Sequence, residues 1–381
     1  MRNIRIGKLL GIPILINPSW FVLLGLTTWL LAARVFPDSF GEASTQTYVL
    51  MALASVLLFF ASIVLHELAH SAVARAYQIP VRSITLFVFG GVAQITREAK
   101  RPLAELLMAA AGPLTSLVLG VLFLGAWWAL GAQSSRPVDH VIVWLGITNG
   151  ALAVFNLIPA FPMDGGRIFR SLIWLIGRDY NRATTIAAWT GRGFAWLLMA
   201  TGFLAFLNVN VYVAEPGFSG LWLVFIGLFL ENAARSSLLQ NRYIQALDRV
   251  TIGEIMIPDP PVIDPDMTVA SLARGVLEIN PRVCYFVEDE GRLAGIISGY
   301  QMYEVPEGLW DSVTAGQAMI PRDRLLAVDP DKKVSEILLD MEQRDLTHMP
   351  VVREGRVVGV VGRDRILNVL RQAGLLRLPA R

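Results

Sequence analysis

Two histidines and a glutamate in one short segment, His66-Glu67-Leu68-Ala69-His70, have the types and spacing needed for chemistry. Side chains four positions apart share one face of a helix, so His66 and His70 can both reach one metal ion. Glu67 lies beside them and could accept a proton from a water molecule that the metal polarises. The H-E-x-x-H spacing therefore predicts a hydrolytic metal site.

The stretch before this motif is apolar, and residues 43–65 contain no charged residue. Such a run is long enough to cross a bilayer core, which takes about 20 residues in a helix. In a soluble helix, two histidines at this spacing are usually ordinary hydrogen-bonded side chains. At membrane depth ionisable groups are costly and usually functional, which favours the metal site.

The composition of the whole chain indicates a membrane protein. Of its 381 residues, 54% are hydrophobic and only 17% are charged, whereas soluble domains have about 25% charged residues. The net charge of +2 gives no basis for nucleic-acid binding, so we expect no nucleic-acid partner. Cys284 is the only cysteine, which excludes an intrachain disulfide and a cysteine-based zinc site.

About six apolar segments are each close to the length that spans a lipid bilayer. They cover approximately residues 19–35, 48–77, 103–130, 141–158, 194–207 and 218–235. Basic residues such as Arg75, Lys100 and Arg178 lie on the side of the N-terminus, whereas the opposite loops carry only Arg34 and Arg136 at their margins. Because cytoplasmic loops are enriched in Lys and Arg, we expect a multi-pass integral protein of the cell membrane with both termini cytoplasmic.

Two segments have the character of strands. Residues 3–16 are rich in β-branched side chains and broken by Gly and Pro, so we expect a short strand pair at the membrane surface. Residues 80–97 combine β-forming side chains with a bend at Gly90-Gly91. An exposed edge there could hold a substrate in extended form, and the glycines would allow close backbone approach. The alternative is a plain interfacial hairpin.

Asp164 is the expected third metal ligand, because zinc that keeps one position open for water needs three protein ligands. His140 is predicted on the far side of the membrane and His348 in the soluble part, whereas Asp164 follows a Pro-rich break at the depth of the motif. Asp164 could instead cap the helix expected at residues 165–176. Asn156, at the same break, could donate to an oxyanion or form a helix–helix hydrogen bond.

The predicted chemistry is peptide hydrolysis. Zinc held by two imidazoles and one carboxylate lowers the pKa of water towards about 7. Glu67 would accept the proton as the oxygen attacks a carbonyl, and would return that proton to the leaving nitrogen.

Several motifs together resemble the site-2 protease family of intramembrane zinc metalloproteases. They are residues 66–70 in a membrane helix, Ala-Gly-Pro at 111–113 in the next span, and Asn156 followed by the Pro-rich break that ends at Gly165. The resemblance covers about residues 1–235. It implies that the substrates are single-span transmembrane proteins in the lipid bilayer, cut in regulated intramembrane proteolysis.

The same resemblance implies roles for individual residues. One Zn²⁺ per chain would be held by His66, His70 and Asp164, with Glu67 as the catalytic glutamate. Substrate or oxyanion binding is implied for Asn156, and a membrane-reentrant β segment for Gly90 and Gly91.

The chain becomes soluble in character after about residue 241, and it repeats. Residues 255–258 (Ile-Met-Ile-Pro) recur as residues 318–321 (Ala-Met-Ile-Pro), and the Asp-Pro-Asp at 264–266 recurs at 329–331. This duplication resembles a tandem pair of cystathionine-β-synthase-type (CBS) domains.

The expected fold is a polytopic α-helical membrane protein with a small membrane-associated β segment, followed by an α/β tandem CBS module. We expect an intramembrane metalloprotease domain at residues 1–240 and the CBS pair at 241–381, with its copies at about 250–307 and 313–372.

CBS pairs often bind adenine nucleotides, using a Thr or Ser three residues before an Asp that holds the ribose. Here Ser298 is followed by Gln301 where the Asp is expected, and in the second copy Asp364 comes one residue early. The resemblance therefore implies an adenine nucleotide near Ser298 and Asp364, or else a regulatory or dimerisation module that binds no ligand. CBS modules frequently mediate dimers, so a homodimer through these domains is also implied. A different class of function is a CBS-regulated membrane transporter or channel, whose pathway the polar residues at membrane depth would line.

Overall fold

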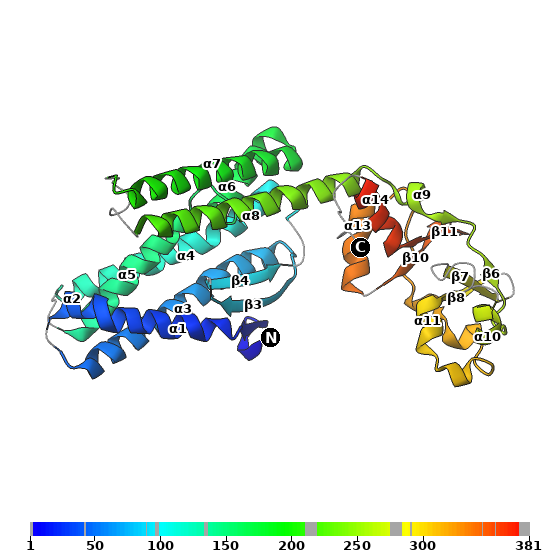
Figure 1. Cartoon of the computed structure of the whole chain (residues 1–381), viewed down its shortest axis with the longest axis horizontal. Helices are drawn as coiled ribbons and strands as arrows, with labels where there is room; N and C mark the ends of the chain where they lie inside the picture. Colours follow the sequence, from blue (N-terminus) through cyan, green and yellow to red (C-terminus); the bar gives the residue numbers. More distant parts are fainter. Residues whose placement is uncertain are drawn as a thin grey trace. The chain divides into compact units, whose positions relative to one another are not determined.

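The computed structural model describes residues 3–41, 43–88, 90–95, 99–132, 136–209, 219–274, 284–289, 292–344, 346–354 and 356–372. The chain divides into two compact units, Met1–Leu239 and Gln240–Arg381 (Figure 1). The last residues of the strand segment expected at 80–97 lie outside the described part.

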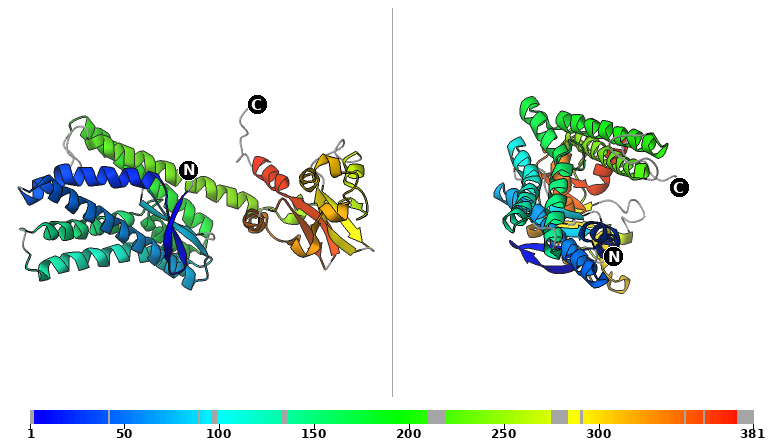
Figure 2. Two further views of the ribbon diagram at one scale, coloured as in Figure 1. Left: turned by 90° about the horizontal axis from the view of Figure 1, so that it is seen from below. Right: turned by 90° about the vertical axis from the view of Figure 1, so that its left-hand side faces the viewer.

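Long helices dominate the first unit (Figure 2). Among the described residues, five helices are long and apolar enough to cross a membrane. They are Ser19–Phe40, which comprises α1 (Ser19–Leu30), the π-helical turn η1 (Leu31–Val35) and α2 (Phe36–Phe40), then α3 (Thr45–Ala76), α4 (Pro102–Ala129), α5 (Pro137–Asn156) and α8 (Ser219–Asp248). These helices confirm an integral membrane architecture.

The remaining expected span, residues 194–207, forms the second half of α7 (Tyr180–Phe206). Its apolar part alone would extend only about 21 Å at 1.5 Å per residue, less than the roughly 30 Å of a bilayer core. The first half of α7 carries Arg182 and Arg192. Five described helices therefore meet the requirement for a span where about six were expected.

The helix that carries the H-E-x-x-H motif, α3, contains no Gly or Pro and is uninterrupted over 32 residues. Its N-cap residue is Ser44, whose hydroxyl accepts a hydrogen bond from the Thr47 N–H. Its buried face includes Ser62, His66 and His70, which recur every four positions. The continuous helix therefore directs both histidines into the protein and not towards lipid.

A four-stranded sheet in the order β1-β2-β3-β4 lies beside α3. Its strands are β1 (Ile4–Leu9), β2 (Ile12–Ile16), β3 (Val81–Phe87) and β4 (Gly90–Ile95). β2 and β3 are parallel, and the other two pairs are antiparallel. Both expected strand segments are confirmed, and they join in one sheet with β4 at an edge.

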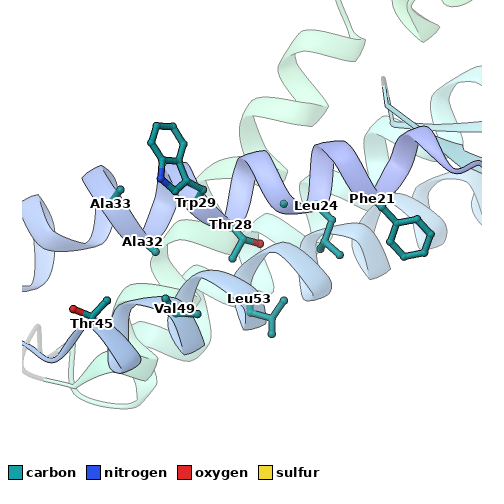
Figure 3. Close-up of a pocket in the computed structure, with 10 residues that line it drawn as sticks. Phe21, Leu24, Thr28, Trp29, Ala32, Ala33, Thr45, Val49 and Leu53 are labelled. Carbon is teal, nitrogen blue, oxygen red and sulfur yellow. The ribbon is translucent and has the colours of Figure 1, made fainter.

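An apolar groove lies between α1 and α3 (Figure 3). Phe21, Leu24 and Trp29 line it from α1, and Val49 and Leu53 from α3. Its lining contains no ionisable side chain. Leu53 is about 20 Å along α3 from His66, so this groove takes no part in the motif's chemistry.

The second unit contains two small sheets, in the orders β10-β11-β5 and β6-β7-β8-β9. The strands are β5 (Ile257–Pro258), β6 (Val262–Ile263), β7 (Cys284–Asp289), β8 (Arg292–Ser298), β9 (Ile320–Pro321), β10 (His348–Arg353) and β11 (Arg356–Gly362). The helices are α9 (Ile252–Ile255), α10 (Val269–Leu272), α11 (Gly299–Glu304), α12 (Ala315–Ala318), α13 (Val334–Gln343) and α14 (Arg363–Gln372), with short 3₁₀ turns at Glu307–Leu309 and Arg322–Arg324.

The repeated Met-Ile-Pro motifs link the two copies. β5 of the first copy pairs with β11 of the second, and β9 of the second copy pairs with β8 of the first. Met256 lies against Gly359, and Met319 lies against Gly295 in the equivalent place. The duplication therefore folds as one α/β unit whose copies exchange a strand.

Candidate active site

Three side chains converge between α3 and α6 (Asp164–Gly177). The Nε2 atoms of His66 and His70 are 3.2 Å apart, and Asp164 Oδ2 lies 3.2 Å from the first and 3.1 Å from the second. Within the described residues, this is the one group of His, Cys, Asp or Glu side chains arranged to hold a metal ion. Ligand atoms about 2.0–2.1 Å from zinc at tetrahedral angles stand roughly 3.3 Å apart, so the donor set suits zinc.

Gly112 of α4 leaves the space that an ion would need. A Cβ atom at this position would lie 2.2 Å from His70 Nε2 and 2.6 Å from His66 Nε2. Those separations are close to a metal–ligand bond length, so a side chain would occupy the place of the metal. The sequence drew attention to Gly112 only as part of a motif, and its position beside both nitrogens is a finding of the structure.

The second nitrogen of each ring is also held by α4. His70 Nδ1 lies 2.6 Å from the Met108 carbonyl oxygen, which can only accept, so Nδ1 carries the proton and Nε2 keeps its lone pair. His66 Nδ1 lies 2.8 Å from the hydroxyl of the fully buried Ser116. Met108, Gly112 and Ser116 recur every four residues, so one face of α4 orients both imidazoles.

Asp164 is delivered by the Pro-rich break after α5. A Cβ atom at Gly165 would lie 2.3 Å from the Leu157 carbonyl oxygen, and one at Gly166 would lie 2.7 Å from the Ala160 carbonyl carbon. Only glycines permit this packing, which brings the start of α6 against the end of α5. Met163 is the N-cap residue of α6, and the Asp164 carboxylate faces the histidines instead of capping the helix.

Glu67 lies against the edge strand β4. Its Oε2 accepts a hydrogen bond of 3.0 Å from the Ala93 N–H. A Cβ atom at Gly91 would lie 2.9 Å from Glu67 Cγ, so only glycine allows this approach. Gly90 adopts a φ of +118°, which favours glycine on conformational grounds. The structure therefore brings the expected Gly90-Gly91 bend directly beside Glu67.

Asn156 is the last residue of α5 and is half-buried. The next residue, Leu157, contacts Gly165 through its carbonyl group, so Asn156 lies near the loop that carries Asp164. Among the described residues its side chain forms no hydrogen bond. Its expected role in substrate or oxyanion binding stays a prediction.

The two candidate nucleotide residues of the CBS unit have local partners. The Ser298 hydroxyl donates to Gln301 Oε1 at 2.6 Å, and Gln301 Oε1 also accepts from the Ser298 N–H, which closes a capping box on α11. Asp364 lies in the first turn of α14, close to Gly362. Burial lowers the pKa of the neighbouring His348, and the negative charge of Asp364 opposes this shift.

Residues 54–134 and 128–200 match the model of Peptidase family M50, and residues 252–302 and 316–372 match that of the CBS domain. The protein sll0528 of Synechocystis sp., named provisionally as a zinc metalloprotease, is 36% identical over 97% of this chain and 95% of its own. Zinc metalloprotease MJ0392 of Methanocaldococcus jannaschii is 27% identical over 97% and 96% of the two chains. The solved site-2 protease from Methanocaldococcus jannaschii is 29% identical over 62% of this chain and 95% of that chain, with a TM-score of 0.42. The chain therefore belongs to Peptidase family M50, the site-2 type of intramembrane zinc metalloprotease, and carries two CBS domains.

Proposed function

We propose that this chain hydrolyses peptide bonds within or near the transmembrane segments of single-span membrane proteins, in regulated intramembrane proteolysis. Residues 1–240 form the protease domain and residues 241–381 a regulatory CBS pair. The observation that carries the proposal is the convergence of His66 Nε2, His70 Nε2 and Asp164 Oδ2 within 3.2 Å of one another, with Glu67 on the same helix.

Each residue of the site has a separate role in this proposal. His66, His70 and Asp164 hold one zinc ion, which supplies Lewis-acid polarisation of a carbonyl and acidifies water. Glu67 accepts the proton of the attacking water and delivers it to the leaving nitrogen. The Ala93 N–H holds one oxygen of the Glu67 carboxylate and so orients the base.

The edge strand β4 is the proposed platform for the substrate. A transmembrane helix hides its peptide carbonyls in its own hydrogen bonds, so the cleaved segment must become extended. A segment that pairs with β4 would run past Glu67, because β4 contacts Glu67 through Gly91 and Ala93. Asn156, at the end of α5, is the proposed side-chain donor to the substrate or to the oxyanion.

The orientation follows from the charges of the loops. The 27 residues of α7 extend about 40 Å as a helix, so α7 as a whole would supply a sixth crossing beside the five apolar helices. Six crossings put both termini on one side, and the basic residues on that side put them, and with them the CBS pair, in the cytoplasm. We propose that the CBS pair regulates cleavage, either by binding an adenine nucleotide near Ser298 and Asp364 or by forming a homodimer without a ligand. The Ser298–Gln301 capping box favours the second version, because it already engages the hydroxyl.

The test is cleavage of a model single-span substrate by the full chain reconstituted in lipid, with metal analysis of each variant. Wild type and Glu67→Gln should each bind one zinc ion, but Glu67→Gln should cleave about 10²–10⁴-fold more slowly. His70→Ala and Asp164→Ala should lose zinc. Equal cleavage by wild type and Glu67→Gln would contradict the role of Glu67. Metal-dependent ion flux without cleavage would support the transporter instead.

A further inference from the structure

A buried ion pair joins the two helices that build the metal site. Glu105 of α4 is 1% exposed and Arg170 of α6 is 8% exposed. Arg170 Nη2 donates a hydrogen bond to Glu105 Oε1. Taking two charges out of water is costly, and apolar replacements of such a pair are often equally stable. Stability alone therefore gives a weak reason for placing this pair here.

Arg170 is also held by two aromatic rings. Its guanidinium carbon lies 5.3 Å from the centre of the Phe161 ring and 4.8 Å from that of Tyr180. Phe161 belongs to the loop that precedes Asp164, and Tyr180 begins α7. Arg170 thus fixes the position of α6 against α4, against α7 and against the loop that delivers the third ligand.

Glu105, the other member of the ion pair, lies close to the residue of α4 that orients His70. Glu105 is one turn before Met108, whose carbonyl oxygen accepts the His70 Nδ1 proton. Arg167 strengthens this connection, because its Nη2 lies 3.9 Å from Met108 Sδ and its Nε lies 4.0 Å from Glu105 Oε1. The ion pair therefore connects the helix that orients the imidazoles to the helix that begins with Asp164.

We propose that Glu105 and Arg170 are positioning residues, which hold the Asp164 carboxylate at the correct separation from His66 and His70. The inference rests on the proposed zinc site. Neither residue contacts a ligand atom, so their effect reaches the site through the placement of α4 and α6. Residues that hydrogen-bond a metal ligand directly contribute about 10–100-fold to metal affinity, and this range sets the scale expected for the ion pair.

The test measures the zinc affinity of the purified full chain by chelator competition, together with its thermal unfolding. Glu105→Gln and Arg170→Met should each lower zinc affinity about 10–100-fold. The double variant Glu105→Leu/Arg170→Met removes both buried charges. It takes Glu105 away only from the partly exposed Arg167, so the variant should unfold near the wild-type temperature. It should still bind zinc weakly, because apolar side chains do not reproduce the fixed geometry of the ion pair.

The matched control is a second ion pair of the same unit. Arg192 of α7 donates to Glu231 Oε1 of α8 at 3.0 Å, and its guanidinium carbon lies 4.4 Å from the centre of the Trp189 ring. This pair also combines a carboxylate and an aromatic ring, but neither α7 nor α8 carries a ligand. Glu231→Gln should keep the zinc affinity of the wild type.

Two results would overturn the inference. One is a double variant that binds zinc as tightly as the wild type, and the other is a Glu231→Gln variant as defective as Glu105→Gln. Failure of the proposed function has a different outcome, because the wild type would then bind no zinc or His70→Ala would retain it. If His70→Ala loses zinc while Arg170→Met binds it normally, the positioning role alone is wrong.

Discussion

Replacing Gly112 by alanine adds one methyl group to α4 at the point that faces both histidine nitrogens. The added Cβ would lie 2.2 Å from His70 Nε2, whereas real Cβ contacts below 3.0 Å are essentially never seen. His70 must therefore retreat until the contact is at least 3.0 Å. The displacement is several times the tolerance of about 0.2 Å on metal–ligand distances.

The size of the effect follows from the loss of one ligand. A four-ligand structural zinc site has an apparent binding free energy of about 10–16 kcal/mol. One ligand then corresponds to roughly 3 kcal/mol, or ~100-fold in zinc affinity. The methyl group also fills the place of the ion, so this is a lower limit. We expect Gly112→Ala to be purified without zinc and to cleave no model substrate.

The assay compares zinc content, zinc affinity and helical content of the full chain in detergent. Gly125→Ala is the control, because Gly125 belongs to the same helix and an added Cβ there would meet nothing within 4 Å. A Gly-to-Ala change in a helix by itself stabilises by about 0.5–1 kcal/mol. Gly125→Ala should thus keep full zinc content. If Gly112→Ala bound one zinc ion with wild-type affinity, the metal would not lie between His66, His70 and α4.

Three further outcomes are expected. Ser116→Ala removes the partner of His66 Nδ1 and should weaken zinc binding about 10–100-fold in chelator competition, with unchanged helical content. Gly91→Ala pushes against Glu67 Cγ and should slow cleavage at least ~10-fold while the metal content stays at one zinc, because only the base is displaced. Burial lowers the pKa of His348, so the unfolded chain binds the proton more readily than the folded one. The free energy of unfolding of the CBS unit should therefore fall as the pH drops below about 6.5, and calorimetry of the full chain should find this dependence weakened in His348→Gln.

Local patterns were enough for much of the architecture. Apolar runs predicted the long helices, Gly and Pro among β-branched residues predicted the strands, and the recurring motifs indicated the duplicated CBS unit. The bounds of one helix were predicted less well from its apolar stretch, because α7 begins at Tyr180, well before residues 194–207. The sequence patterns did not predict which distant strands pair. In the structure β2 pairs with β3, and the two CBS copies exchange β5 and β9.

The sequence by itself determined the pairing of His66 with His70, because four residues of an α-helix always return to the same face. It also indicated Asp164, since few other ionisable residues lie at that depth. The supports of the site were decided by the tertiary structure alone. Ser116 is 50 positions from His66, and a serine or glycine in an apolar helix carries no local signal of its partner. Gly112 and Ser116 recur with Met108 every four residues, and this spacing was the one sign in the sequence that they share a face of α4. Which face of α4 meets α3 depends on how both helices pack, and packing is set by the whole fold.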